Sequence, residues 1–182
     1  MTDDTQTEHD HLADLAGLAD ERGLRVCVAE SLTSGRLAST VAAGEGAGGW
    51  FGGGIVAYQT AEKERILGVT PGLDPCSAEV AEQLAAGALS LFEADLCVAT
   101  TGVGGPGPDG RGNPEGTVYV GWASPLGVGH KKLALSGDPE DIMDAAVDAA
   151  VRMLALHAES IRPAGPLRGG AGDTDRAESA EA

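Results

Sequence analysis

The stretch VCVAESLTSGRLAST, residues 26 to 40, places a serine directly after an apolar, strand-like run. Ligands of open α/β sheets bind beyond the carboxyl ends of the strands, where the next helix offers free backbone amides to a developing anion. Ser31 is therefore a candidate nucleophile. The alternative is that Ser31, Thr33 or Ser34 only caps the following helix, because a hydroxyl there accepts a hydrogen bond from an early amide.

A nucleophilic serine needs a base, and the sequence offers a lysine rather than a histidine. The Gly-x-Ser-x-Gly elbow of hydrolases is absent around Ser31, and no histidine lies in an obvious turn after a predicted strand. Lys63 follows soon after the predicted strand that ends at Tyr58, so both are expected at the same end of the sheet as Ser31. A partly desolvated lysine can accept a proton. A solvated lysine within AEKER is the alternative reading.

A long loop with the sequence TGVGGPGPDGRGNPEG carries the next candidates. Gly102, Gly104 and Gly107 form a literal GxGxxG, the pattern of dinucleotide-binding loops. That fingerprint needs a helix beginning inside the motif, which the three prolines of this loop forbid, and no Walker lysine follows. We interpret the loop as backbone that can approach a phosphate or ribose closely. A plain connection is the alternative, although long structureless loops in compact domains are usually functional.

The spacing of apolar residues indicates the elements that position these candidates. Helices are expected over residues 11–23, 34–44, 61–68, 77–94 and 139–157. Strands are expected over residues 24–30, 50–60, 95–102, 116–124 and 130–137, the last two joined as a hairpin. This order predicts an α/β fold, a three-layer α/β/α sandwich with a mixed, mostly parallel sheet. We expect one domain at residues 11–160, between a flexible acidic tail at 1–10 and a disordered tail at 161–182.

Composition limits the classes of partner. The 28 acidic and 12 basic residues give a net charge of -16, which disfavours nucleic acid and anionic lipid as partners. This acidity favours adaptation to a salt-rich cytoplasm, with an acidic binding tail as the other reading. The start of the chain does not resemble a signal peptide, and no apolar run approaches the ~18 residues that span a bilayer. We therefore expect a cytoplasmic protein without a membrane partner, and no metal site, because no ligand cluster has metal-binding spacing.

Four blocks of sequence together resemble the C-terminal domain family of the competence and damage-inducible protein CinA. The blocks are VAESLTSGRLAS, GGGIVAYQTAEKERILGV, TTGVGGPGPDGRGNPEGTVYVGWA and LSGDPEDI, and their order and spacing match over about residues 11–158. The family includes nicotinamide-nucleotide amidases, which hydrolyse the carboxamide of nicotinamide mononucleotide to nicotinate mononucleotide and ammonia. The resemblance implies this activity here, without a cofactor, in a stand-alone amidase form that is a homodimer.

The resemblance also implies roles for individual residues. Ser31 would be the nucleophile, and Lys63 and Tyr58 would activate it or carry its proton. The backbone amides around Thr33 and Ser34 would form part of the oxyanion site, and such donors are often worth ~3 kcal/mol each. The loop residues assigned to the ribose phosphate are Thr101, Gly102, Gly104, Gly105 and Gly107.

Two positions depart from the family pattern. The family usually has an arginine directly after the Gly-Asp of its last block and another four residues later, where this chain has Pro139 and Met143. If either arginine holds the phosphate, affinity or activity is reduced here, unless Arg36 or Arg111 supplies the charge. Two alternatives therefore stay open: a non-catalytic nucleotide-binding or regulatory module, and an amidase that acts on a different pyridine carboxamide.

Overall fold

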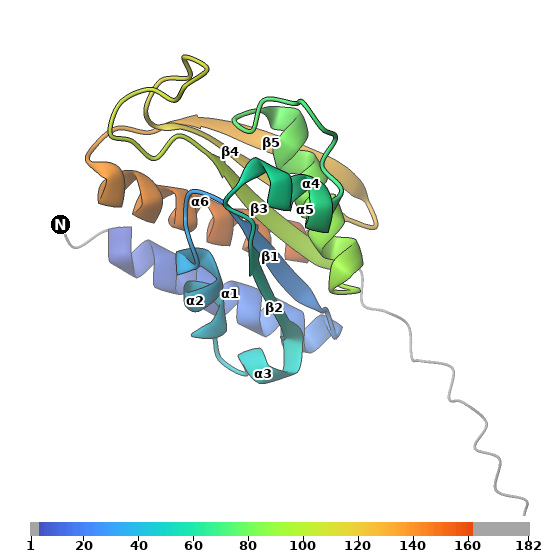
Figure 1. The fold of residues 1–182 in the computed structure, drawn as a ribbon. Helices are drawn as coiled ribbons and strands as arrows, with labels where there is room; N and C mark the ends of the chain where they lie inside the picture. Colours follow the sequence, from blue (N-terminus) through green and yellow to red (C-terminus); the bar gives the residue numbers. More distant parts are fainter. Residues whose placement is uncertain (1–3, 162–182) are drawn as a thin grey trace, which may run out of the picture.

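The computed structural model describes residues 4–161 of the chain, with side chains from residue 11 onward. Its five strands form one sheet in the order β2-β1-β3-β4-β5 (Figure 1). The strands are β1 (Val26–Glu30), β2 (Phe51–Val56), β3 (Leu96–Gly102), β4 (Thr117–Ser124) and β5 (Gly127–Ala134). β1 pairs in parallel with β2 and β3, whereas β4 is antiparallel to both of its neighbours. Only β4 therefore runs against the common direction of the sheet.

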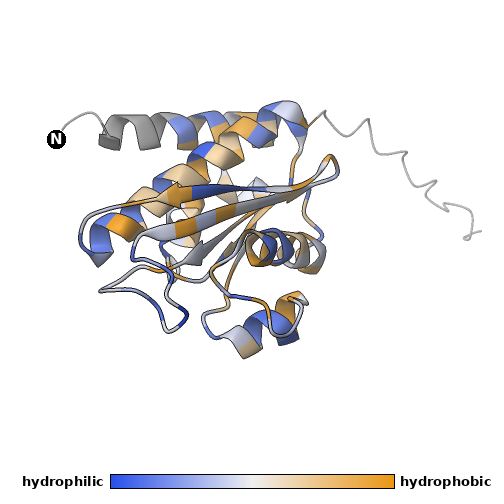
Figure 2. Ribbon diagram, turned by 90° about the horizontal axis from the view of Figure 1, so that it is seen from above, coloured by the Kyte–Doolittle hydropathy of each residue, from blue (hydrophilic) through white to orange (hydrophobic). Residues whose placement is uncertain are grey.

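Helices cover both faces of this sheet, as the view from above shows (Figure 2). The helices on one face are α1 (Asp4–Arg22), α2 (Arg36–Ala42), α3 (Ala47–Trp50) and α6 (Pro139–Ser160). Those on the other face are α4 (Thr60–Leu67) and α5 (Ala78–Leu91). The predicted three-layer α/β/α sandwich with a mixed, mostly parallel sheet is confirmed.

The central strand β1 is buried on both faces, which explains why its sequence is a continuous apolar run. Val26 and Val28 pack into the core beneath α1 and α6. Cys27 and Ala29 alternate with them and pack beneath α4 and α5. The same alternation decides to which face the residues at the end of β1 point.

The long helix α6 begins where the sequence predicts, because its N-terminus is capped. Asp138 accepts hydrogen bonds from the amides of Glu140 and Asp141, and the Asp141 side chain accepts the Asp138 amide. Pro139 occupies the first helical position, where its missing amide hydrogen removes no helical bond. This cap fixes the N-terminal end of α6 beside the loop that follows β3.

Several element boundaries differ from the sequence predictions. The structure begins α1 at Asp4, so residues 4–10 are helical where we expected a tail, and residues 162–182 lie outside the described part. The short helix α3 was missed, because residues 47–50 are too few to show helical periodicity. β5 begins at Gly127, earlier than predicted, because residues 127–129 continue the antiparallel pairing with β4 although two of them are glycines.

Between residues 4 and 161, no helix is both long enough and apolar enough to cross a membrane. All three cysteines are free and buried.

Candidate active site

Ser31 lies at the carboxyl end of the central strand. Its backbone amide donates to the carbonyl of Thr100 in β3 at 3.0 Å, so the serine continues the parallel ladder by one step. Its side chain is largely buried, and its Oγ accepts a hydrogen bond from Lys63 Nζ at 2.9 Å. The predicted approach of Ser31 and Lys63 to one end of the sheet therefore corresponds to a direct contact in the structure.

Lys63 reaches the serine from α4, whose start lies just beyond the carboxyl end of β2. The lysine side chain is 2% exposed, and its Nζ also donates to the backbone carbonyl of Tyr58 at 2.7 Å. Burial lowers the pKa of Lys63 below that of a solvated lysine, because the charged form loses hydration. No carboxylate is bonded to its ammonium in the described residues. This lysine is thus a candidate base rather than a solvated surface cation.

Tyr58 contributes its backbone to this contact rather than its phenol. The side chain is 66% exposed and lines the cavity above Ser31. The carbonyl oxygen of Tyr58 fixes the position of the lysine ammonium, which in turn faces the serine hydroxyl. The phenol is thus placed to contact a ligand at the cavity mouth.

A buried glutamate caps α2, a role that the sequence analysis missed. The Glu30 carboxylate accepts the amides of Gly35 at 2.9 Å, Leu37 at 3.1 Å and Ala38 at 2.9 Å. The N-cap residue Gly35 provides no side chain, and no hydroxyl caps this helix. The hydroxyl of Ser31 is therefore not the cap of α2 and faces Lys63 instead. The available signal was an acidic residue at the buried end of an apolar strand, directly before a helix start.

The residues that follow Ser31 form a tight turn. The Ser34 amide donates to the Ser31 carbonyl at 3.2 Å, and Ser34 itself has a φ of 50°. Thr33 is fully buried, shares a hydrogen bond of 2.8 Å with the Thr100 hydroxyl, and does not line the cavity. Within residues 4–161, the amides of Leu32 and Thr33 have no hydrogen-bond acceptor. These two amides are the free donors nearest in sequence to the Ser31 hydroxyl.

A cavity of about 510 Å³ opens above Ser31 and Lys63. The loop after β3, residues 103–116 and here called the glycine loop, forms much of its wall. The residues expected to hold a ribose phosphate that line the cavity are Thr101, Gly102, Gly104, Gly105 and Gly107. The hydroxyl of Thr101 already donates to the Pro75 carbonyl at 2.6 Å, so this hydroxyl is held by the protein.

Cys76 and Asp109 are two other ionisable side chains of the cavity wall that bear on its charge and reactivity. Burial, with the nearby charges of Asp74 and Asp109, raises the pKa of Cys76 to about 11, so this thiol stays protonated and does not compete with Ser31 as a nucleophile. The hydrogen bond from the Asn113 side chain lowers the pKa of Asp109, which also lines the cavity. The cavity wall therefore carries a carboxylate and a neutral thiol.

The first residues of α6 form another part of the cavity wall. Pro139 and Met143, the two positions where family arginines are missing, both line the cavity. Arg36 does not replace them, because its guanidinium pairs with Glu140 and Asp144 on α6. Among the described residues that line this cavity, Lys63 is the only one with a basic side chain.

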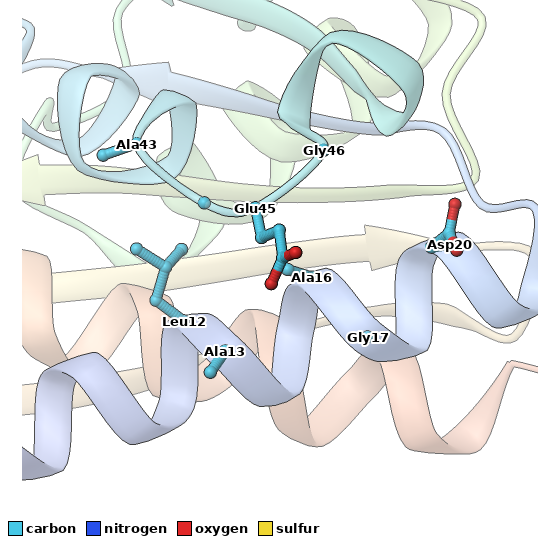
Figure 3. Close-up of a pocket in the computed structure, with 9 residues that line it drawn as sticks. Leu12, Ala13, Ala16, Gly17, Asp20, Ala43, Glu45 and Gly46 are labelled. Atoms are coloured by element: carbon cyan, nitrogen blue, oxygen red, sulfur yellow. The ribbon is translucent and has the colours of Figure 1, made fainter.

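A second cavity of about 520 Å³ lies between α1 and the turn at residues 43–46 (Figure 3). Leu12 and Glu45 point into this space, and Asp20 lies at its other end. Its described lining contains no serine, cysteine, histidine or lysine. The candidate chemistry therefore belongs to the cavity above Ser31, although the two cavities are similar in size.

The fold and this site define a three-layer α/β protein with a serine–lysine pair at the carboxyl end of its central strand. The family model for the CinA C-terminal domain matches residues 8–157, and the chain belongs to this family. A CinA-like protein of Frankia casuarinae is 40% identical over 147 residues, which are 76% of this chain and 34% of that protein. A CinA-like protein of Flavobacterium psychrophilum is 33% identical over 144 residues, 77% of this chain and 34% of that protein.

Solved structures of the same superfamily share the fold. A competence-damaged protein (CinA) superfamily protein from Escherichia coli is 32% identical, with a TM-score of 0.80 over 86% of this chain and 94% of that chain. One from Klebsiella pneumoniae is 26% identical, with a TM-score of 0.80 over 85% of this chain and 99% of that chain. The chain spans about a third of the length of the curated relatives named above.

Proposed function

We propose that the chain is a nicotinamide-nucleotide amidase, which hydrolyses the carboxamide of nicotinamide mononucleotide to nicotinate mononucleotide and ammonia. The observation that carries this proposal is the 2.9 Å hydrogen bond between Lys63 Nζ and Ser31 Oγ at the base of an open cavity. A serine beside a buried lysine is a recurring arrangement for amide hydrolysis. The nicotinamide nucleotide is chosen because the chain belongs to the CinA C-terminal domain family.

In the proposed reaction, neutral Lys63 accepts the Ser31 proton while Oγ attacks the carboxamide carbon. The free amide of Leu32, a residue that lines the cavity, is the candidate donor to the oxyanion that forms. The C–N bond then breaks, the leaving nitrogen takes a proton from the Lys63 ammonium, and ammonia departs. Water attacks the resulting ester with Lys63 again as base, which releases the carboxylate and restores the serine.

The environment of Lys63 suits this role. A lysine in water is almost wholly protonated at neutral pH and is a poor base. Burial lowers the pKa of Lys63 and so increases the neutral fraction, while the Tyr58 carbonyl keeps Nζ directed at the serine. Glu30 does not counteract this shift, because its carboxylate is bonded to the amides of α2.

A second candidate function is a non-catalytic module that binds a nucleotide. It is favoured by one observation: Pro139 and Met143 line the cavity at the two positions where the family pattern has arginines, so this chain departs from the family at the site itself. This candidate predicts binding of the mononucleotide without release of ammonia.

The test is ammonia release from nicotinamide mononucleotide by the purified chain, at low and at multimolar KCl. Ser31→Ala should abolish turnover and Lys63→Met should reduce it strongly, whereas Ser39→Ala, which removes an exposed hydroxyl from α2, should leave it unchanged. Circular dichroism checks the fold of each variant. Ammonia release that survives in Ser31→Ala would refute the proposal, and binding without turnover in the wild type would favour the non-catalytic module.

A further inference from the structure

The glycine loop already holds a negative charge of its own. Glu115 Oε2 accepts a hydrogen bond from the Gly107 amide at 2.8 Å. Its other oxygen packs so closely against Gly105 that a Cβ on that glycine would lie 2.3 Å from it. Gly105 and Gly107 have φ values of 87° and 80°, a backbone conformation typical of loops that wrap an anion. The carboxylate of Glu115 therefore occupies an anion position on this loop.

The described residues that line the cavity offer a phosphate no free cation in exchange for that position. Gly105 and Gly107 line the cavity, and the carboxylate of Asp109 lines it beside them. Lys63, the only basic side chain of the described lining, has its Nζ bonded to Ser31 and to the Tyr58 carbonyl. A phosphate dianion in this cavity would face the Asp109 carboxylate, with no free cation among the described lining residues, whereas this carboxylate would not repel a neutral or cationic ligand.

We propose that Glu115 is a specificity-determining residue, and that the cavity takes phosphate-free nicotinamide compounds at least nearly as well as the mononucleotide. The further class of ligand is a nicotinamide carrying a sugar without phosphate, whose pyridinium cation suits an acidic wall. This inference rests on the proposed function for its choice of ligands. The phosphate then contributes little to kcat/KM, although the mononucleotide remains a substrate.

The test compares kcat/KM for nicotinamide mononucleotide with that for nicotinamide riboside. In the wild type, the mononucleotide should be favoured by less than about tenfold, because the phosphate adds little binding energy. Glu115→Gln keeps an oxygen that accepts the Gly107 amide but removes the charge, and should raise the ratio about tenfold, mainly through a lower KM for the mononucleotide. Glu21→Gln removes one exposed carboxylate from the end of α1 and should leave the ratio unchanged.

The same comparison can be made without turnover. Calorimetric binding of both ligands to the Ser31→Ala variant, with and without Glu115→Gln, measures the phosphate contribution directly. Should Glu115→Gln not fold, Asp109→Asn removes the other carboxylate at the loop and should shift the ratio in the same direction.

The outcomes separate this inference from the proposed function. No ammonia from either compound refutes the amidase, while the binding ratio still decides the inference. A wild-type preference for the mononucleotide above about a hundredfold, a ratio that Glu115→Gln leaves unchanged, or no binding of either ligand would overturn it.

Discussion

Replacing Glu30 by glutamine tests how the nucleophile is held in place. In the wild type, the two carboxylate oxygens accept three buried amide hydrogens from the start of α2, and the side chain is 1% exposed. Glutamine has nearly the same shape, but one of its two terminal groups donates and cannot accept. At least one of the three amides must therefore lose its acceptor and face another donor.

The cost follows from these contacts. Leaving one buried amide unsatisfied costs about 1–3 kcal/mol, and the two remaining bonds each lose about 0.5–1 kcal/mol when the acceptor becomes neutral. We expect Glu30→Gln to lower the free energy of unfolding by about 3 kcal/mol, a large part of the ~5–15 kcal/mol typical of a domain.

Urea unfolding followed by circular dichroism measures this loss from the shift in midpoint at constant slope. Glu79→Gln is the matched control, because Glu79 also lies in the first turn of a helix but is exposed, and it should cost less than about 1 kcal/mol. A loss below about 1 kcal/mol for Glu30→Gln would refute the reasoning. It would mean that the amides of α2 find other acceptors and that the turn after Ser31 does not depend on this carboxylate.

Four further predictions concern the base and the packing. Lys63→Met should reduce kcat for ammonia release by about 10²–10⁴-fold, because it removes the proposed base. Lys131→Met on the exposed strand β5 is the control and should leave kcat unchanged. Equal effects of the two substitutions would refute the assignment of Lys63 as the base. Because burial lowers the pKa of Lys63, kcat/KM should rise with pH with an apparent pKa below the ordinary lysine value of about 10.4. Steady-state rates from pH 6 to 10 measure this profile. An apparent pKa at or above the ordinary value would contradict the prediction. Between the lowered pKa of Lys63 in the folded state and the ordinary lysine pKa, the unfolded chain binds more protons at this residue than the folded chain does. In this pH range the free energy of unfolding of the wild type should therefore rise with pH relative to that of Lys63→Met. Denaturant titrations at several pH values measure this difference. Gly87→Ala should destabilise the fold by more than about 2 kcal/mol, because its Cβ would lie 2.1 Å from the Leu67 carbonyl oxygen. Gly17→Ala is the control, because a Cβ there meets open space, and it should stabilise α1 by about 0.5–1 kcal/mol. Thermal unfolding measures both effects, and equal shifts in melting temperature would refute the packing argument.

The sequence predicted well those features that depend on local pattern and on the geometry of parallel strands. Neighbouring parallel strands end at the same edge of a sheet, so a serine after β1 and a lysine soon after β2 had to approach one another. The apolar run of β1 and the capped start of α6 were equally readable. These features follow from the local pattern of each element together with the general rule that parallel strands end at one edge.

The features that sequence analysis missed depend on three-dimensional contacts that no periodic pattern encodes, although the residues involved lie at most eight positions apart in the chain. The position of Gly129 in a strand depends on its pairing with Trp122 across the hairpin, which no propensity scale contains. Glu115 meets Gly107 only because the glycine loop turns back on itself. Glu30 was missed because its partners are backbone amides, which every sequence offers, so no complementary side chain reveals the contact.

The alternation of β1 explains how a buried acid and a buried base can adjoin the same serine without pairing. Even-numbered residues of this strand face α1 and α6, so Glu30 points toward the start of α2, whereas Ser31 points to the opposite face, where α4 presents Lys63. If the two charged groups met, the carboxylate would stabilise the ammonium and hold the pKa of Lys63 high, and the lysine would be a poor base. The sheet keeps them apart, and the amides of α2 satisfy the carboxylate. A shift of register by one residue would send Glu30 to the lysine and Ser31 to the helix, so the proposed chemistry requires this register of β1 between β2 and β3.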